Sequence, residues 1–108
     1  MAYDLTQELI DELVDKLPDT SRRNAYGFPC YFVKERVFGL YDGHALVLKL
    51  DKPTGDDLLV QRVAQRFRHA KDASGRMWVR VNPEKLQSEE VLETLIVHSY
   101  KFVLASPA

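Results

Sequence analysis

The stretch from Phe28 to Leu50 constrains the fold of this chain more than any other. It holds three runs rich in aromatic and aliphatic residues, which predict short strands. Lys34-Glu35 separates the first two runs. Asp42-Gly43 separates the last two and is typical of a type I′ hairpin turn, in which both central residues have positive φ. The stretch therefore predicts an antiparallel meander with strands over residues 28–33, 36–41 and 45–51.

Side-chain alternation predicts that both faces of this meander are partly apolar. In the third strand Leu46, Leu48 and Leu50 share one face. In the middle strand Phe38 and Leu40 are predicted to lie opposite Val37, Gly39 and Tyr41, because successive strand residues point to opposite sides. One face must pack on helices, and the glycine inside the strand predicts a bulge or a close backbone neighbour.

Outside this stretch, the sequence predicts helices and one further strand. Apolar residues at helical spacing predict helices over residues 4–17, 56–70 and 89–104. Pro18 ends the first helix, and Ser88 caps the last. Residues 18–27 and 52–55 are expected as polar turns, and residues 76–82 as the fourth strand. The predicted fold is α+β, with an antiparallel sheet of about four strands, helices at both termini and one helix between the third and fourth strands.

The size and composition of the chain indicate one domain over residues 1–108, because 108 residues are too few for two. Cys30 is the single cysteine, so an internal disulfide and a multi-cysteine zinc site are excluded. The start of the chain is acidic, unlike a signal peptide, and no apolar run reaches the roughly 20 residues that span a bilayer. We expect a cytoplasmic protein that does not enter a membrane.

Charge is distributed unevenly along the chain. The net charge is −1, but residues 21–80 carry +6 and the two ends together carry −7. A basic middle is typical of a surface that contacts phosphates or an acidic partner. Trp78, beside Arg80 in the predicted fourth strand, is a candidate for stacking on a base. The candidate nucleic-acid contacts are Arg22, Arg23, Arg62, Arg66, Arg68, Lys71, Arg76 and Arg80. Each also has the simpler interpretation of a solvated surface charge.

Catalytic and metal-binding signatures are missing from the sequence. His44, His69 and His98 lie on different predicted elements, with no second ligand at metal-binding spacing. The scattered glycines form no phosphate-binding loop. We therefore expect no enzyme activity, no cofactor and no metal site.

Several short motifs resemble the superfamily of the MmcQ/YjbR-like proteins and the TfoX N-terminal domain. The matching positions are Val37-Phe38-Gly39, Leu48-Lys49-Leu50, Trp78-Val79 and Ser99-Tyr100, and the similarity covers about residues 24–105. The resemblance implies a frataxin-like layered architecture. It also implies a regulatory role, because YjbR-like members are thought of as DNA binders and the TfoX domain belongs to a competence regulator. It supplies no catalytic residues.

Three hypotheses about function follow. The first is a small regulatory domain that binds DNA through its basic middle region. The second is a protein-interaction or dimerisation module that uses the partly apolar second face of the sheet. The third is frataxin-like cation binding by the acidic first helix, where Glu8, Asp11, Glu12 and Asp15 lie on the outer side.

Overall fold

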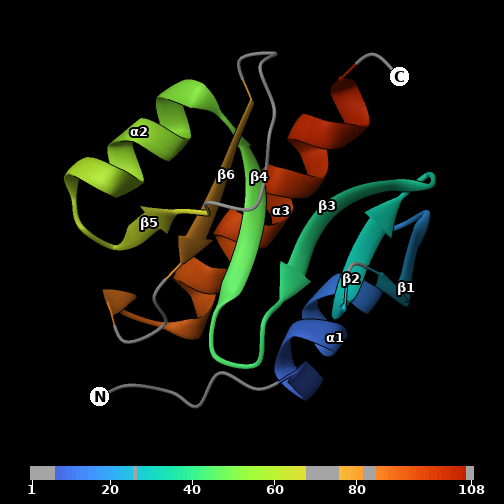
Figure 1. Ribbon diagram of the computed structural model, residues 1–108. Helices are drawn as coiled ribbons and strands as arrows, with labels where there is room; N and C mark the ends of the chain where they lie inside the picture. The colour runs from blue at the N-terminus through green and yellow to red at the C-terminus, as the bar shows by residue number, and fades with distance from the viewer. Residues whose placement is uncertain (1–6, 26, 68–75, 82–84, 107–108) are drawn as a thin grey trace.

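Three helices pack on one side of an antiparallel sheet in the computed structural model, which describes residues 7–25, 27–67, 76–81 and 85–106 (Figure 1). The helices are α1 (Gln7–Asp15), α2 (Lys52–Val60) and α3 (Glu89–Ala105). The strands are β1 (Thr20–Ala25), β2 (Phe28–Val33), β3 (Arg36–Tyr41), β4 (Leu46–Asp51), β5 (Ala64–Arg66) and β6 (Arg76–Val81). Their order in the sheet is β1-β2-β3-β4-β6-β5. The predicted α+β class with an antiparallel sheet is confirmed.

The central meander and the last helix follow the prediction closely. β2 and β3 have the predicted bounds, and β4 begins one residue later than predicted, at Leu46. The Ser88 side chain caps α3 by accepting a hydrogen bond from the Val91 backbone N–H at 3.4 Å. The first helix is confirmed over Gln7–Asp15, whereas the predicted start at residues 4–6 lies outside the described residues.

The prediction of about four strands is wrong, because the described residues form a sheet of six. Part of the expected polar connection over residues 18–27 is β1, which pairs along its whole length with β2. Its sequence, TSRRNA, has no apolar alternation, and its four central residues are exposed. Pairing with a hydrophobic neighbour, rather than its own pattern, makes this segment a strand. The second additional strand, β5, is only three residues long.

The second helix also differs from the prediction. Lys52–Gly55 forms the first turn of α2 and not a separate turn, because Asp51 caps the helix by accepting the Thr54 backbone N–H at 3.1 Å. Pro53 is compatible with that first turn because its missing N–H is not needed there. The helix ends at Val60 and does not reach residue 70. Arg62 has φ of 62°, and the backbone N–H groups of Arg62 and Val63 donate to the carbonyls of Leu59 and Leu58. This is a Schellman end with arginine in the left-handed position.

The type I′ turn lies at a different connection from the one predicted. Lys34 and Glu35 both have positive φ, at 46° and 68°. In the loop after β3, Gly43 has φ of 97°, but Asp42 does not have positive φ. Instead, the Asp42 carboxylate accepts the backbone N–H groups of His44 and Ala45 at 2.9 and 2.8 Å. The aspartate therefore closes this loop through its side chain.

A β-bulge at Phe38 changes which side chains share a face. Tyr31 pairs with Gly39, and the next residue of β2, Phe32, pairs with Val37, so Phe38 is the extra residue in β3. Phe38 packs among the helices, whereas Leu40 lies on the other side of the sheet. The predicted pairing of Phe38 and Leu40 on one face is therefore wrong. The expected bulge and close approach near Gly39 are confirmed: a Cβ there would lie 3.1 Å from Leu48 Cδ2.

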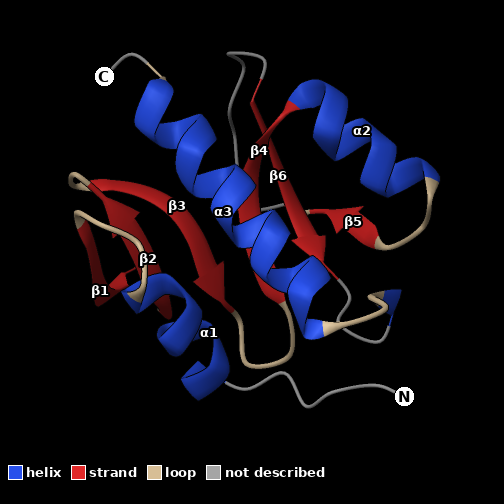
Figure 2. Cartoon of the chain, turned by 180° about the vertical axis from the view of Figure 1, so that it is seen from behind, coloured by secondary structure: helices blue, strands red, loops and turns tan. Residues whose placement is uncertain are grey.

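Ser99 of α3 bridges the two halves of the sheet. β3 and β4 pair over only three residues, ending at Gly39 and Leu48, and β3 then bends away (Figure 1). The Ser99 hydroxyl lies 2.9 Å from the Phe38 carbonyl oxygen and 2.7 Å from that of Lys49, the next residue on each strand. Its single proton is shared between these two acceptors. α3 crosses the sheet at this junction, as Figure 2 shows.

The sheet has two differently covered faces. On one face, residues of all three helices pack against the strands to form the main core. We call the other side the open face, because no described helix residue packs on it. Its buried residues are Cys30, Phe32, Leu40 and Val47, and its half-buried residues are Ala25, Phe28, Val37, Phe67 and Trp78.

The Ser99→Ala variant should be destabilised by about 1–3 kcal/mol, because two buried carbonyls lose their shared donor. Ser99 is 0% exposed, so water cannot replace the hydroxyl without repacking. Urea unfolding measures the difference. The control is Thr94→Ala on the same helix, whose exposed hydroxyl bonds only to the Glu90 carbonyl. That variant should change stability by less than about 0.5 kcal/mol. Equal stability of the two variants would contradict the role of Ser99 at the junction.

Candidate functional site

The open face carries two cations stacked on aromatic rings. The guanidinium carbon of Arg23, on β1, lies 3.8 Å from the ring centroid of Phe32. Lys49 Nζ, on β4, lies 5.1 Å from the ring centroid of Trp78, the residue directly opposite it on β6. Such pairs hold a positive charge beside a ring face. The open face therefore offers cations and aromatic rings together.

Arg80 lies on the same face but is held by a carboxylate. Its Nε donates to Asp42 Oδ2 at 2.7 Å, and this pair fixes the loop after β3 against β6. Burial alone would raise the pKa of Asp42. Hydrogen bonds from Arg80 and from the backbone N–H groups of His44 and Ala45 outweigh burial, so this pKa lies below its ordinary value. Arg80 is therefore partly neutralised where it lies.

Arg22 points to the opposite side of the sheet from Arg23. Its guanidinium forms ion pairs of 3.1 Å with Asp11 and with Asp15 of α1. The side-chain hydrogen bond with Asp15 and the charge of Asp11 raise the pKa of Arg22. The Tyr31 hydroxyl donates to the other oxygen of Asp11 at 2.8 Å. This network ties α1 to β1 and β2. It pairs Arg22 with Asp11 and Asp15, two of the four acids predicted on the outer side of the first helix.

The remaining predicted contacts do not form one basic helix face. Arg62 lies in the turn after α2. Arg66 lies on β5 opposite Val79 of β6, so it is on the helix side of the sheet, whereas Trp78 and Arg80 are on the open face. Arg62 and Arg66 would have shared one face of the helix predicted over residues 56–70, but α2 ends at Val60. Arg76 starts β6 opposite Asp51, and only its backbone is described. Arg68 and Lys71 lie outside the described residues.

Sequence reasoning missed Lys49 and Phe32 as parts of the site. Lys49 lies on the face of β4 opposite Leu46, Leu48 and Leu50. This alternation was the one sequence signal that could have placed Lys49 on the open face. Its position beside Trp78 needed the pairing of β4 with β6, which lie far apart in sequence. From the sequence alone, Phe32 looks like any other core residue. Its contact with Arg23 depends on the register of β1 against β2, which the sequence does not reveal.

Asp51, Thr54 and His98 form a polar cluster that joins α3 to the start of α2. His98 Nε2 lies 2.7 Å from Asp51 Oδ1 and 3.2 Å from Thr54 Oγ1. Both contacts use the same ring nitrogen, so the imidazole cannot relay a proton between them. Burial alone would raise the pKa of Asp51, but hydrogen bonds from His98 and Thr54 lower it below its ordinary value. Among the described residues, no group of three or more His, Cys, Asp or Glu side chains could hold a metal ion.

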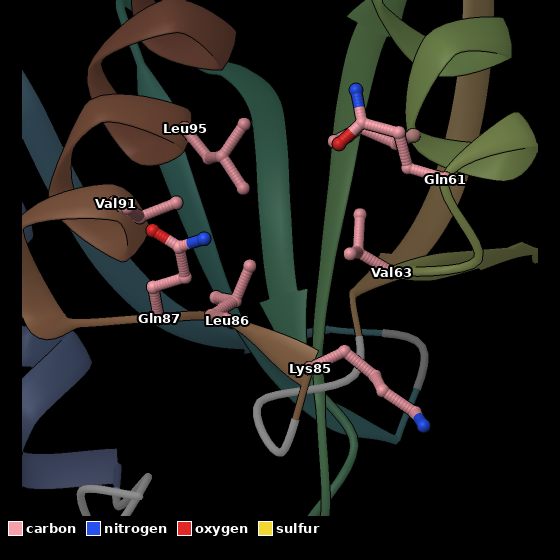
Figure 3. A pocket seen from close by; sticks show the side chains of 8 residues that line it. Gln61, Val63, Lys85, Leu86, Gln87, Val91 and Leu95 are labelled. Carbon is pink, nitrogen blue, oxygen red and sulfur yellow. The ribbon is translucent and has the colours of Figure 1, made fainter. Parts of the chain in front are cut away.

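A cavity of about 260 Å³ lies between the end of α2 and the start of α3 (Figure 3). Its walls are mainly aliphatic. Gln61 at its rim already donates to Asp57 at 2.7 Å, which leaves few polar groups to orient a ligand. The lining residues are Leu58, Gln61, Val63, Lys85, Leu86, Gln87, Val91 and Leu95.

Comparisons of the chain with protein-family models, with curated proteins and with solved structures found no match. None of the helices in the described ranges has the length and apolar character needed to cross a membrane.

Replacing Asp42 by asparagine should destabilise the fold by about 1–2 kcal/mol at pH 7, because a charge-assisted pair with Arg80 is lost. The pKa of Asp42 is lowered in the folded chain, so its ionised form stabilises the fold above the unfolded pKa of about 3.9. That stabilisation is lost as the pH falls below this value towards the folded pKa. Thermal unfolding between pH 7 and pH 3 should therefore show the difference from wild type shrinking below about pH 4.

The matched control for this series is Asp56→Asn. Asp56 forms an exposed pair with Lys52 at 2.7 Å, one helical turn away. Its loss should cost less than about 0.5 kcal/mol. An Asp42→Asn effect that is equally large at pH 3 and pH 7 would contradict the ionic origin of the stabilisation.

Proposed function

We propose that this chain is a non-enzymatic regulatory domain that binds single-stranded nucleic acid through the open face. The observation that carries this proposal is the pair of cation–aromatic contacts, Arg23 on Phe32 and Lys49 on Trp78. Proteins that bind single strands combine cations that contact phosphates with aromatic side chains on which bases stack. The side of the sheet that the described helices leave uncovered has cations and one half-buried ring, Trp78, whereas Phe32 is buried and serves only to hold Arg23.

The arrangement favours a single strand over a DNA duplex. Duplex readers commonly insert a helix or a β-ribbon into the major groove. The helix predicted over residues 56–70, which would have carried Arg62 and Arg66, ends at Val60, and α2 has no basic residue in its last turn. Trp78 projects from the open face and is only half-buried, so an unpaired base can stack on the exposed part of its ring. This narrows the predicted DNA-binding role to unpaired strands.

The resemblance to the MmcQ/YjbR-like and TfoX N-terminal superfamily remains part of the proposal. A sheet with its described helices on one side supports a frataxin-like layered architecture. We also propose a cytoplasmic location. Cys30 is compatible with it, because a free thiol fits a reducing compartment.

The two alternative functions have less support from the geometry. Dimerisation through the open face would need an apolar patch there. Among the described residues, the exposed large hydrophobic side chains are Val60 and Val91, at 80% and 37%, and neither lies on that face. Cation binding on α1 would have to displace Arg22 from Asp11 and Asp15.

Trp78 is the single tryptophan of the chain, so its fluorescence reports directly on the open face. We expect oligo-dT to quench this fluorescence at low salt because a base stacks on the indole. Binding should weaken as salt rises, since phosphate contacts release counterions. A duplex of the same length should bind more weakly. Tight duplex binding, or no quenching at low ionic strength, would contradict the proposal.

Fluorescently labelled oligo-dT allows variants to be compared by anisotropy. Trp78→Ala should weaken binding by about 5- to 150-fold, the usual range for one lost stacking contact. Lys49→Gln should weaken binding and reduce the salt slope by about 0.7. The control is Lys16→Gln, which removes the same charge from the helix side, where Lys16 pairs with Glu93. Equal effects of Lys16→Gln and Lys49→Gln would show that only net charge matters.

A further inference from the structure

β1 is a long edge strand whose outer side is exposed. It stands first in the sheet order, and β2 is its one partner among the described strands. Residues 21–24 are all exposed. The opposite edge, β5, is only three residues long and offers far less backbone. β1 is therefore the edge where a further strand has room to pair.

The register shows which backbone groups face outward. Lys34 N–H donates to the Asp19 carbonyl at 3.0 Å, and these two residues lie one step beyond the Thr20–Val33 pair. In antiparallel pairs, hydrogen-bonded residues alternate with residues that are not bonded across the ladder. Ser21, Arg23 and Ala25 therefore bond to β2. The N–H and C=O groups of Thr20, Arg22 and Asn24 point away from the sheet, and no backbone partner of theirs is found among the described residues.

We propose that β1 binds an extended peptide as a seventh strand, paired with Thr20, Arg22 and Asn24, and that this peptide carries carboxylates on its open-face side. Main-chain hydrogen bonds supply affinity in such strand addition, and alternate side chains supply specificity. This interaction goes beyond nucleic-acid binding and uses backbone groups that a nucleic acid cannot match in register.

The charge of β1 argues for an acidic partner and against a second copy of the chain. β1 contains two arginines and no acid. Antiparallel pairing of two β1 strands would bring arginines of both copies together, which is unfavourable. Charged edge residues commonly protect against such self-pairing.

The two sides of the added strand meet different surroundings. On the helix side, Arg22 is already paired with Asp11 and Asp15. On the open-face side, Arg23 is paired with Glu35 at 3.3 Å, and the Glu35 side chain is 78% exposed. An exposed pair of this kind is weak, so a peptide carboxylate can replace Glu35 at little cost. A peptide of alternating glutamate and threonine matches both sides, with glutamates toward Arg23 and threonines toward Arg22.

The experiment uses this glutamate–threonine peptide, long enough to span β1, with amide hydrogen exchange followed by NMR. In the free protein the amides of Ser21, Arg23 and Ala25 should exchange slowly, and those of Thr20, Arg22 and Asn24 quickly. The peptide should slow exchange at the second set only. Unchanged exchange at these three amides with millimolar peptide would overturn the proposal.

Two comparisons sharpen the test. Asn24→Pro removes one outward N–H but no bond to β2, whereas Asn24→Ala keeps that N–H. The proline variant should bind the peptide about tenfold more weakly than the alanine variant. Equal binding by both would overturn the proposed register.

The charge of the partner is tested with a second peptide. A lysine–threonine peptide that binds as tightly as the glutamate–threonine peptide would overturn the proposal that the partner is acidic. Protection of the same amides by oligo-dT but not by the peptide would assign this edge to nucleic acid instead.

Discussion

The hydroxyl of Ser99 joins α3 to the sheet at the point where β3 and β4 separate. β3 and β4 hold together over three residue pairs, and the two carbonyls beyond the last pair have no partner in that ladder. Ser99 bonds to both and so places α3 across the junction. The bulge at Phe38 adds to this arrangement, because the extra residue packs against Tyr100 of α3 in an edge-on ring contact. With α3 fixed here, the main core forms on one side of the sheet.

Electrostatics then divides the basic residues between the two sides of the sheet. Neighbouring residues of β1 point in opposite directions, so Arg22 pairs with the acids of α1 while Arg23 stacks on Phe32 of the open face. The apparent charge excess of residues 21–80 is therefore not one basic patch. What remains on the open face is a smaller set of cations, each placed beside a ring or a carboxylate. The single strand that we propose as the ligand can thread between separate contacts, whereas a rigid duplex cannot.

Local signals in the sequence predicted the meander and α3 well, because alternation, a serine cap and a long apolar helix stripe all agree there. They failed for β1, whose structure is decided by pairing with another strand, and for the two ends of α2. β1 has a polar sequence and is a strand only because β2 is beside it. α2 begins at the Asp51 cap, which was hidden by the turn-like sequence Lys52-Pro53-Thr54-Gly55, and it ends at an arginine in a conformation usually taken by glycine. The candidate site was predicted in part: Arg23, Trp78 and Arg80 lie on the open face, but Lys49 needed the β4–β6 register.

We propose that nucleic acid binds to the open face, and not to the helix side or to the cavity beside α2. The most direct measurement is a map of NMR shift changes when oligo-dT is added to the isotopically labelled chain at low salt. The largest changes should fall on the indole N–H of Trp78, the side-chain N–H of Arg23 and the amides of β4 and β6 around Lys49. Changes concentrated on α1, α3 or the cavity residues Leu58 and Val91, or no changes at all, would contradict it.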